Sequence, residues 1–347
     1  MLRPLKLKMQ RAPQPAGPAA TDLPVASVWV DTAIPTLTEP FSYLIPEQLS
    51  SQVSIGSRVQ VPFKDKHLEG IVIDRTALTT DARELKSIYK LLGEYPVASA
   101  ETLELISLTA SFWGGSPYDV IRSAIPPRVA SAEKGLSVAA KPSTPKSEGV
   151  ATFHLLPPKL DPISALCSLV LSRKSSGVKL IIVPTARDLL RLGASLAEQD
   201  VEFASLDSNL PRADRYRNFL FASLGAANIV IGMRGAIFAP IPGLSEIYLH
   251  QENSEHYYER RTPYWNTREV AWIRSKLSNL ELHFTGYVPS LDVAIDIDKK
   301  EITYQATREK ISVLAQASSN GELIPSKIYQ QVRKAIATGP VLFLVPA

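Results

Sequence analysis

The stretch that decides the fold is IVIGMRGAIFAP, residues 229–240, in which an apolar strand pattern runs into a glycine-containing turn. The next apolar run, EIYL at 246–249, ends in the polar residues 250–253. Around both runs, from residue 151 to about 296, apolar strand patterns alternate with helical patterns. This alternation predicts an α/β domain with a doubly wound parallel sheet.

The individual elements of this domain follow from the same periodicity. We expect strands at 180–184, 202–206, 228–232, 247–249 and 282–285, and helices at 188–199, 212–224 and 268–277.

The region before the α/β domain has a different pattern. Four short apolar segments, separated by Pro, Gly or Ser, lie at 25–30, 41–46, 58–63 and 70–74. Closely spaced short strands predict a small β-barrel or half-barrel. Helices are expected after it, at about 100–112 and 117–125, the second ending at Pro126 and Pro127.

Composition sets bounds on what the chain does. Its 347 residues are 45% hydrophobic and 21% charged, as in a globular protein, and the net charge of +4 is a mild bias toward polyanions. The single cysteine excludes a disulfide framework or a cysteine-rich zinc module within these residues. No apolar run approaches the roughly 18 residues of a membrane span, and the N-terminus lacks the apolar core of a secretory signal, so we expect a cytoplasmic location.

Composition shifts also predict the domain organisation. We expect a disordered tail at 1–23, a small β-barrel domain at 24–130, a linker at 131–150, an α/β lobe at 151–300 and the start of a second lobe at 301–347. The last segment contains the apolar run 341–345, which looks like a core strand without a following partner. We therefore expect the chain to be truncated.

The residues needed for ATP chemistry are missing from the pattern. No Gly-Lys dipeptide occurs, so no GxxxxGK[ST] phosphate loop can be drawn, and 161–167 reads as a short apolar helix instead. At the end of the strand at 246–249 stand His250, Gln251, Glu252 and Asn253, with one carboxylate among them. Because Mg²⁺ is held through carboxylates and substrate phosphates, we interpret these four residues as a degenerate nucleotide site.

The α/β domain resembles a superfamily-2 helicase lobe of the primosomal protein N′ (PriA) replication-restart family. Residues 229–240 resemble that family's Gly-Thr-Arg-Ser-Ala-Leu-Phe turn, and 250–253 stand where it carries an acidic Asp-Glu-Glu-His box. Residues 183–187 look like its first DNA-contacting segment, and 285–292 like its coupling motif. The loss of the helicase motifs resembles the actinobacterial branch.

The N-terminal region carries the second half of the resemblance. Residues 41–47, 55–63, 70–72 and 84–86 are similar in order and spacing to the family's 3′-end DNA-binding domain. The resemblance implies DNA contacts by Phe41 and Lys86, although Ser42 stands where the family has an Asp. Phe41 and Tyr43 alternate along a strand, so they are divided between core and surface in the plainer interpretation.

The segment 257–268 interleaves four aromatic residues with three arginines, a combination that stacks unpaired bases and neutralises phosphates. In the alternative interpretation the aromatics pack on the lobe, and the arginines pair with Glu255, Glu259 and Glu269. The predicted DNA-binding residues are Phe41, Tyr43, Lys86, Arg187, Arg234, Tyr257, Tyr258, Arg260, Arg261, Tyr264, Trp265 and Arg268.

A metal site is not expected. His250, Glu252, His256 and Glu259 could be drawn together, but their spacing fits no specific ligand pattern. The family uses ATP, Mg²⁺ and Zn²⁺, and no motif for these cofactors is present here.

The resulting hypothesis is a DNA-binding replication-restart protein that recognises branched, 3′-ended or single-stranded DNA. It would present that DNA to primosome or helicase-loading proteins, without membrane association and without unwinding. Two alternatives stay open: an ATP-dependent 3′-to-5′ helicase with an atypical nucleotide site, and an interaction scaffold without DNA affinity.

Overall fold

The computed structural model describes residues 17–34, 36–77, 85–137, 149–174, 177–306 and 324–344. The chain divides into two compact units, one up to Thr307 and one from Arg308 onward, which are considered separately. Of the tail predicted at 1–23, residues 1–16 lie outside the described residues. Residues 17–23 do not fit the prediction, because Ala20 is buried and its N–H donates to the Ile45 carbonyl at 2.8 Å.

The N-terminal sheet contains the four predicted strands and one more, in the order β2-β1-β4-β3-β5, with antiparallel pairing throughout. Its strands are β1 (Val25–Val30), β2 (Phe41–Leu44), β3 (Arg58–Phe63), β4 (Lys66–Thr76) and β5 (Lys90–Leu91). The segment that leads into β5 bonds to both edges: Leu44 of β2 pairs with Lys86 and Ile88, and Tyr89 donates to Gln60 of β3. This segment closes the sheet into a small barrel, as predicted.

Two helices follow the barrel at the predicted positions, α1 (Ala100–Phe112) and α2 (Pro117–Ala124). Each begins at a serine whose hydroxyl accepts a backbone N–H: Ser99 before α1, and Ser116 before α2. Their apolar side chains belong to the same core cluster as Trp29 of β1 and much of the α/β lobe. The helices therefore join the barrel to the lobe through a shared core.

The predicted linker at 131–150 is partly described, and that part is packed. The 3-10 helix η3 (Ala130–Glu133) places Glu133 against the lobe, where its carboxylate accepts from the Tyr216 hydroxyl at 3.0 Å and from Arg128. Arg58 of the barrel lies over the Tyr216 ring. Residues 138–148 lie outside the described residues, and the domain bounds remain predictions.

The α/β lobe is built on a seven-stranded parallel sheet, in the order β12-β6-β11-β10-β7-β9-β8. The strands are β6 (Ala151–Leu155), β7 (Val178–Ile182), β8 (Ala204–Leu206), β9 (Ile229–Gly232), β10 (Leu244–His250), β11 (Glu281–Gly286) and β12 (Ile302–Gln305). The helices are α3 (Pro162–Ser172), α4 (Ala186–Ala197), α5 (Arg212–Ser223), α6 (Thr267–Ser278) and α7 (Leu291–Asp298), with the 3-10 helices η4 (Arg234–Phe238) and η5 (Glu255–Tyr257). β12 pairs with β6, so the expectation that a second lobe begins at 301 does not hold for this strand.

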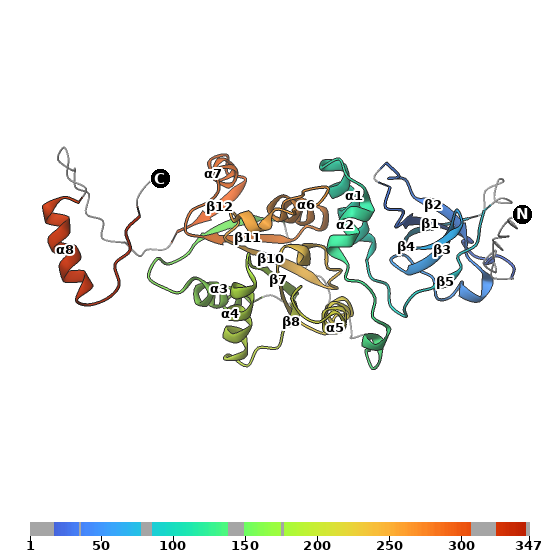
Figure 1. Cartoon of the computed structure of the whole chain (residues 1–347), viewed down its shortest axis with the longest axis horizontal. Helices are drawn as coiled ribbons and strands as arrows, with labels where there is room; N and C mark the ends of the chain where they lie inside the picture. Colours follow the sequence, from blue (N-terminus) through green and yellow to red (C-terminus); the bar gives the residue numbers. More distant parts are fainter. Residues whose placement is uncertain are drawn as a thin grey trace, which may run out of the picture. The chain divides into compact units, whose positions relative to one another are not determined.

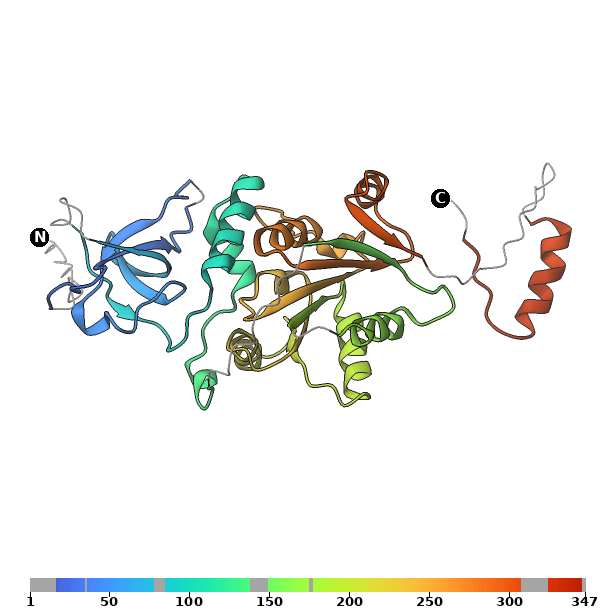
Figure 2. The same ribbon diagram turned by 180° about the vertical axis from the view of Figure 1, so that it is seen from behind.

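Helices cover both faces of this sheet, as a parallel sheet requires (Figures 1 and 2). Along β7, Leu180 and Ile182 face the core that contains α6 and α1, whereas Ile181 and Val183 face the core under α3 and α4. The predicted doubly wound α/β class is confirmed. Within the described ranges, no helix is both long and apolar enough to cross a membrane.

The second unit is described from 324 to 344 and contains one helix, α8 (Ser326–Ile336). The strand predicted at 341–345 is not formed at 341–344, where Leu342 is 82% and Leu344 is 87% exposed. A strand needs a neighbour for its backbone hydrogen bonds, and no other strand is described in this unit.

Candidate nucleic-acid interface

The loops at the carboxyl ends of the parallel strands bring the predicted motifs together, since all these ends meet at one edge of the sheet. β7 runs into Thr185, whose hydroxyl accepts the Asp188 N–H and begins α4. β9 runs through Met233 into η4, and β10 continues into the loop at 251–266 that carries η5.

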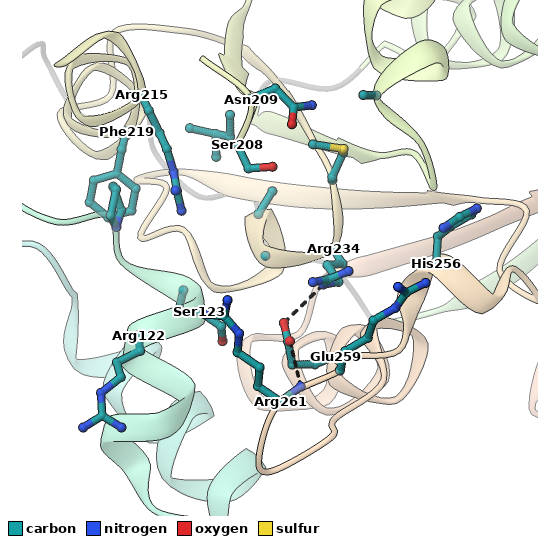
Figure 3. A pocket seen from close by; sticks show the side chains of 18 of the residues that line it. Arg122, Ser123, Ser208, Asn209, Arg215, Phe219, Arg234, His256, Glu259 and Arg261 are labelled. Carbon is teal, nitrogen blue, oxygen red and sulfur yellow. Dashed lines mark hydrogen bonds and ion pairs between the residues drawn. The ribbon is translucent and has the colours of Figure 1, made fainter. Parts of the chain in front are cut away.

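A cavity of about 910 Å³ opens at this edge, between α2 and the ends of β7, β8 and β9 (Figure 3). Arginines from four separate segments line it: Arg122 from α2, Arg215 from α5, Arg234 from η4 after β9, and Arg260 and Arg261 from the loop after β10. Polar side chains of Ser123, Ser208, Asn209 and His256 complete the wall, and Asp119 and Glu259 are its acidic residues.

Two of these arginines are neutralised within the protein. Arg234 pairs with the buried Glu259 at 3.2 Å, and Glu259 also accepts the backbone N–H of Arg261 at 3.0 Å (Figure 3). Arg122 pairs with Asp119 at 2.6 Å and with Asp31.

The other three arginines keep their charge available. The side chains of Arg215, Arg260 and Arg261 have no ion pair or hydrogen bond with any described residue. Arg215 projects from α5 into the cavity, and its partial burial lowers the pKa of its guanidinium (Figure 3). An unpaired, partly desolvated guanidinium in a cavity is a site that favours an anion.

The aromatic residues of 257–268 divide between core and surface. Trp265 and Tyr257 have no exposed surface: Trp265 packs edge-to-face on Phe238 with ring centroids 5.0 Å apart, and the Tyr257 hydroxyl donates to the Ile182 and His250 carbonyls. Base stacking by these two residues does not fit the structure, because the hydrophobic gain of burial already fixes them. Tyr258 and Tyr264 are 54% and 60% exposed and remain able to stack.

Arg268 is also engaged inside the protein. Its guanidinium bonds to Glu269, Asp292 and the Ser290 hydroxyl, and lies 3.5 Å from Glu252. The predicted phosphate contact by Arg268 therefore does not fit, since its donors are used. Arg187 is exposed on the first turn of α4, next to the cavity residues Thr185 and Ala186.

The three barrel residues that were predicted to contact DNA also divide into buried and accessible side chains. Tyr43 is 4% exposed and its hydroxyl donates to the Pro62 carbonyl, so it belongs to the barrel core, and its predicted DNA contact does not fit. Phe41 is half-buried against Phe63 with ring centroids 5.3 Å apart. Lys86 is exposed on the segment that closes the barrel, and remains a candidate contact.

Residues 161–167, where a phosphate loop was sought in the sequence, form the start of α3, and residues 156–161, LPPKLD, connect β6 to that helix. Prolines supply no N–H donors, and Asp161 caps α3 by accepting the Ser164 N–H at 2.9 Å. Its carboxylate thus lies at the helix N-terminus that would otherwise attract a phosphate. Tyr287 of the coupling segment bonds to the Leu160 carbonyl at 3.4 Å.

Residues 250–253, interpreted from the sequence as a degenerate nucleotide site, differ in their exposure. His250 is 1% exposed, its Nδ1 lies 2.9 Å from the Thr285 hydroxyl, and burial lowers its pKa to about 4, so it is neutral at pH 7. Glu252 is 2% exposed and accepts the Ser290 N–H at 2.6 Å. Gln251 and Asn253 line the following turn, Gln251 half-buried with its N–H donating to the Thr285 carbonyl and Asn253 exposed.

Sequence reasoning missed Arg215, Arg122 and the polar pair Ser208 and Asn209. The helices that carry the two arginines were predicted. Nothing in their periodicity separates Arg215 from its exposed neighbours Arg212 and Arg217, because only the fold brings α5 and α2 to the same edge.

Residues 27–126 match the family model described as the 3′DNA-binding domain (3′BD) of PriA. The "Probable replication restart protein PriA" of Mycobacterium tuberculosis H37Rv is 25% identical over 356 residues, which cover 90% of this chain and 54% of that protein. The "Replication restart protein PriA" of Rickettsia conorii is 22% identical, over 78% of this chain and 44% of that protein.

Among solved structures, the C-terminal domain of S. cerevisiae Dbp5 bound to Gle1 and IP6 resembles the chain with a TM-score of 0.35 and 15% identity, covering 55% of this chain and 97% of that one. The chain spans about half the length of the mycobacterial relative that it matches. The match of residues 27–126 to the 3′DNA-binding domain model, and the alignment of replication restart proteins named PriA along 90% of the chain, together support a PriA-family protein.

Proposed function

We propose that the chain is a DNA-binding protein of replication restart that holds branched or 3′-ended DNA and does not unwind it. The observation that carries this proposal is the cavity of about 910 Å³ in which Arg215, Arg260 and Arg261 stand without an internal counter-charge. Arginine forks match phosphate oxygens in geometry as well as charge. Binding there would release counterions and depend on salt.

The barrel would supply the second contact. Residues 27–126 match a 3′DNA-binding domain, and Lys86 and Phe41 lie on accessible parts of the closed sheet. The barrel and the lobe share a core cluster. A DNA 3′ end bound to the barrel and a DNA backbone bound in the lobe cavity would therefore be held by one continuous body.

The absence of unwinding is proposed from the nucleotide position. Phosphoryl transfer depends on positioned cations and backbone donors, whereas residues 156–161 contain two prolines and end on the Asp161 carboxylate. Neutral His250 stands at the usual place of a Mg²⁺-binding carboxylate. Handover to primosome or helicase-loading proteins, and a cytoplasmic location, remain predictions.

The test is fluorescence anisotropy of the full chain with fork, 3′-overhang and blunt duplex oligonucleotides over a range of salt. We expect fork and 3′-overhang DNA to bind more tightly than blunt duplex, with a negative slope of log affinity against log salt. Equal or undetectable binding of all three at low salt would refute the proposal.

Arg215→Gln and Arg217→Gln form a matched pair for the cavity. Both lie on α5, but Arg217 lies outside the cavity and donates to the Lys134 carbonyl at 3.3 Å. If Arg215 contacts a phosphate, its loss lowers the salt slope by about 0.7 to 0.9 and the Arg217 variant leaves it unchanged. Identical slopes in the two variants would place the DNA elsewhere.

Calorimetry with ATP and Mg²⁺, together with phosphate release in the presence of DNA, tests the second half of the proposal. We expect neither micromolar binding nor DNA-stimulated hydrolysis. Either signal would favour the helicase alternative.

A further inference from the structure

Three polar side chains, two of them buried and one partly exposed, lie at the amino ends of β10 and β11, away from the arginine cavity. Glu246, Glu281 and His283 each direct one ligand atom into the same space, and these atoms all lie within 4.8 Å of one another. Glu246 is 3% and His283 is 2% exposed. Burying such groups is costly unless they are paired or coordinate a metal, so this arrangement requires a physical reason.

His283 supplies the second observation. Its Nε2 atom is fully buried and has no hydrogen-bond partner, yet it lies 3.4 Å from a Glu281 oxygen and 3.6 Å from a Glu246 oxygen. Both separations exceed the usual distance of about 2.7 to 3.0 Å for a hydrogen bond to a carboxylate. The spacing between two ligands of a tetrahedral zinc ion with bonds near 2.0 to 2.1 Å is about 3.3 to 3.5 Å, so the 3.4 Å separation falls within it and the 3.6 Å separation lies just above it.

Each buried ligand is also held by an outer partner. The Tyr248 hydroxyl donates to Glu246 Oε2, and His154 Nε2 lies 3.0 Å from His283 Nδ1. His154 in turn bonds to the Gln305 side chain. Outer hydrogen bonds of this kind orient the first ligands of metal sites and set the histidine tautomer.

The two neighbouring cationic side chains, Arg173 and Lys179, do not permanently block the space between the ligand atoms. Arg173 pairs with Glu281 and lies 3.4 Å from Glu246, but its side chain and that of Glu281 are each 35% exposed, so it can move into solvent. Lys179 does not occupy the space, because its ammonium donates to the Val170 and Arg173 carbonyls at 2.7 and 2.6 Å.

We propose that Glu246, Glu281 and His283 form a Zn²⁺ site, with Arg173 as the counter-charge that occupies the carboxylates when the ion is absent. Imidazole nitrogen and carboxylate oxygen are both ligands of zinc, and three protein ligands leave one position for water from the exposed side. This site is separate from the residues first considered for a metal: Glu252 is bound to Arg268 and Ser290, and Glu259 to Arg234. It does not depend on the proposed DNA binding.

The experiment uses the full chain after treatment with a chelator. Zn²⁺ is titrated by calorimetry, and Co²⁺ is added as a spectroscopic probe, because tetrahedral Co²⁺ absorbs strongly in the visible range. We expect one equivalent of Zn²⁺ to bind with a raised melting temperature, and Co²⁺ to show tetrahedral bands without a thiolate charge-transfer band from Cys167.

The variants identify the ligands. Glu281→Gln, at a partly exposed position, and His283→Gln should each weaken Zn²⁺ binding at least about a hundredfold, more than the 10- to 100-fold typical of outer-shell changes. Arg173→Met should tighten it, because the competing cation is gone. His67→Gln, on β4 of the barrel and outside both the arginine cavity and this group of ligands, is the control and should leave Zn²⁺ affinity unchanged.

Absence of saturable binding overturns the proposal, as does stoichiometric binding that persists in Glu281→Gln. If His283→Gln fails to fold, the other two variants decide the question. Weaker Zn²⁺ binding by Glu281→Gln together with tighter Zn²⁺ binding by Arg173→Met supports the site. Equal Zn²⁺ affinities of the two variants refute it.

Discussion

Two groups of charged side chains at the carboxyl edge of the parallel sheet are arranged in opposite ways. In the arginine cavity, Arg215, Arg260 and Arg261 keep unpaired guanidinium groups toward an open volume of about 910 Å³. Around Glu252, every charge is used internally: Glu252 holds Ser290 and Arg268, and Arg268 also binds Asp292. The unpaired guanidinium groups of the first arrangement can bind an external anion, whereas the donors and acceptors of the second are already paired within the protein and stabilise the fold.

The positions of the lobe that resemble helicase motifs fall into two groups. Of the cations predicted to contact DNA, Arg234 and Arg268 are paired within the protein, whereas the others remain exposed: Lys86, Arg187, Arg260 and Arg261. Where the family resemblance predicts nucleotide chemistry, neutral His250, the capping carboxylate of Asp161 and the Glu252 pairs stand instead. Four predictions test this contrast, in order of decreasing effect.

The largest effect is expected for Trp265→Ala, which removes the support under the loop that carries Arg260 and Arg261. Trp265 is fully buried against Phe238, so its loss should lower the free energy of unfolding by about 3 to 5 kcal/mol. Chemical denaturation measures this change. Tyr264→Ala, at the exposed neighbour, should leave stability nearly intact and weaken DNA binding by about 1 to 3 kcal/mol if it stacks on a base. A stable Trp265→Ala protein with lost DNA affinity would restore the stacking interpretation.

The second prediction concerns pH and His250. Its folded-state pKa of about 4 lies below the ordinary 6.5, so the unfolded chain binds the proton more readily and stability falls as pH drops from about 6.5 to 4. A difference of about 2.5 pKa units corresponds to about 3 kcal/mol. In His250→Gln this share of the pH dependence should disappear, measured as melting temperature against pH. Parallel curves for variant and parent would show that His250 is not held neutral.

The third prediction addresses the paired network. Glu252→Gln leaves Arg268 with one fewer carboxylate and weakens the bond from the Ser290 N–H, which should cost about 2 to 3 kcal/mol of stability. DNA affinity of the folded protein should stay the same. Asp296→Asn is the control, since its 3.9 Å pair with Lys299 is at the surface. A drop in DNA affinity without a drop in stability would mean that Glu252 belongs to the binding surface.

The smallest effect is expected for Arg261→Gln. Its side chain has no partner among the described residues, so stability should change by no more than about 0.5 kcal/mol. The slope of log DNA affinity against log salt should fall by about 0.7 to 0.9 if one phosphate contact is lost. Lys276→Gln on α6 removes the same charge outside the cavity and should leave the slope unchanged. Equal slopes for all three proteins would remove Arg261 from the interface.

Much of the architecture could be predicted because periodicity reports which face of an element is buried. The alternation of apolar strand patterns with helical patterns from residue 151 to about 296 predicted the parallel sheet, and the serines at 99 and 116 mark helix starts that local hydrogen bonding alone explains. The strand predicted at 341–345 is not formed at residues 341–344. A strand needs a neighbouring strand for its backbone hydrogen bonds, and apolar composition does not show whether such a neighbour is present.

The sequence by itself determined the two folding patterns, the loss of a phosphate-loop motif and the segments that carry cations. Tertiary structure alone decided which members of those segments are available: it buried Trp265 and Tyr257, engaged Arg268 in ion pairs, and brought Arg215 of α5 and Arg261 of the β10 loop to the wall of one cavity. The physical reason is that a side chain's exposure and pairing depend on elements distant in the chain. Local spacing records the helix or strand on which a residue lies, but not what lies opposite it.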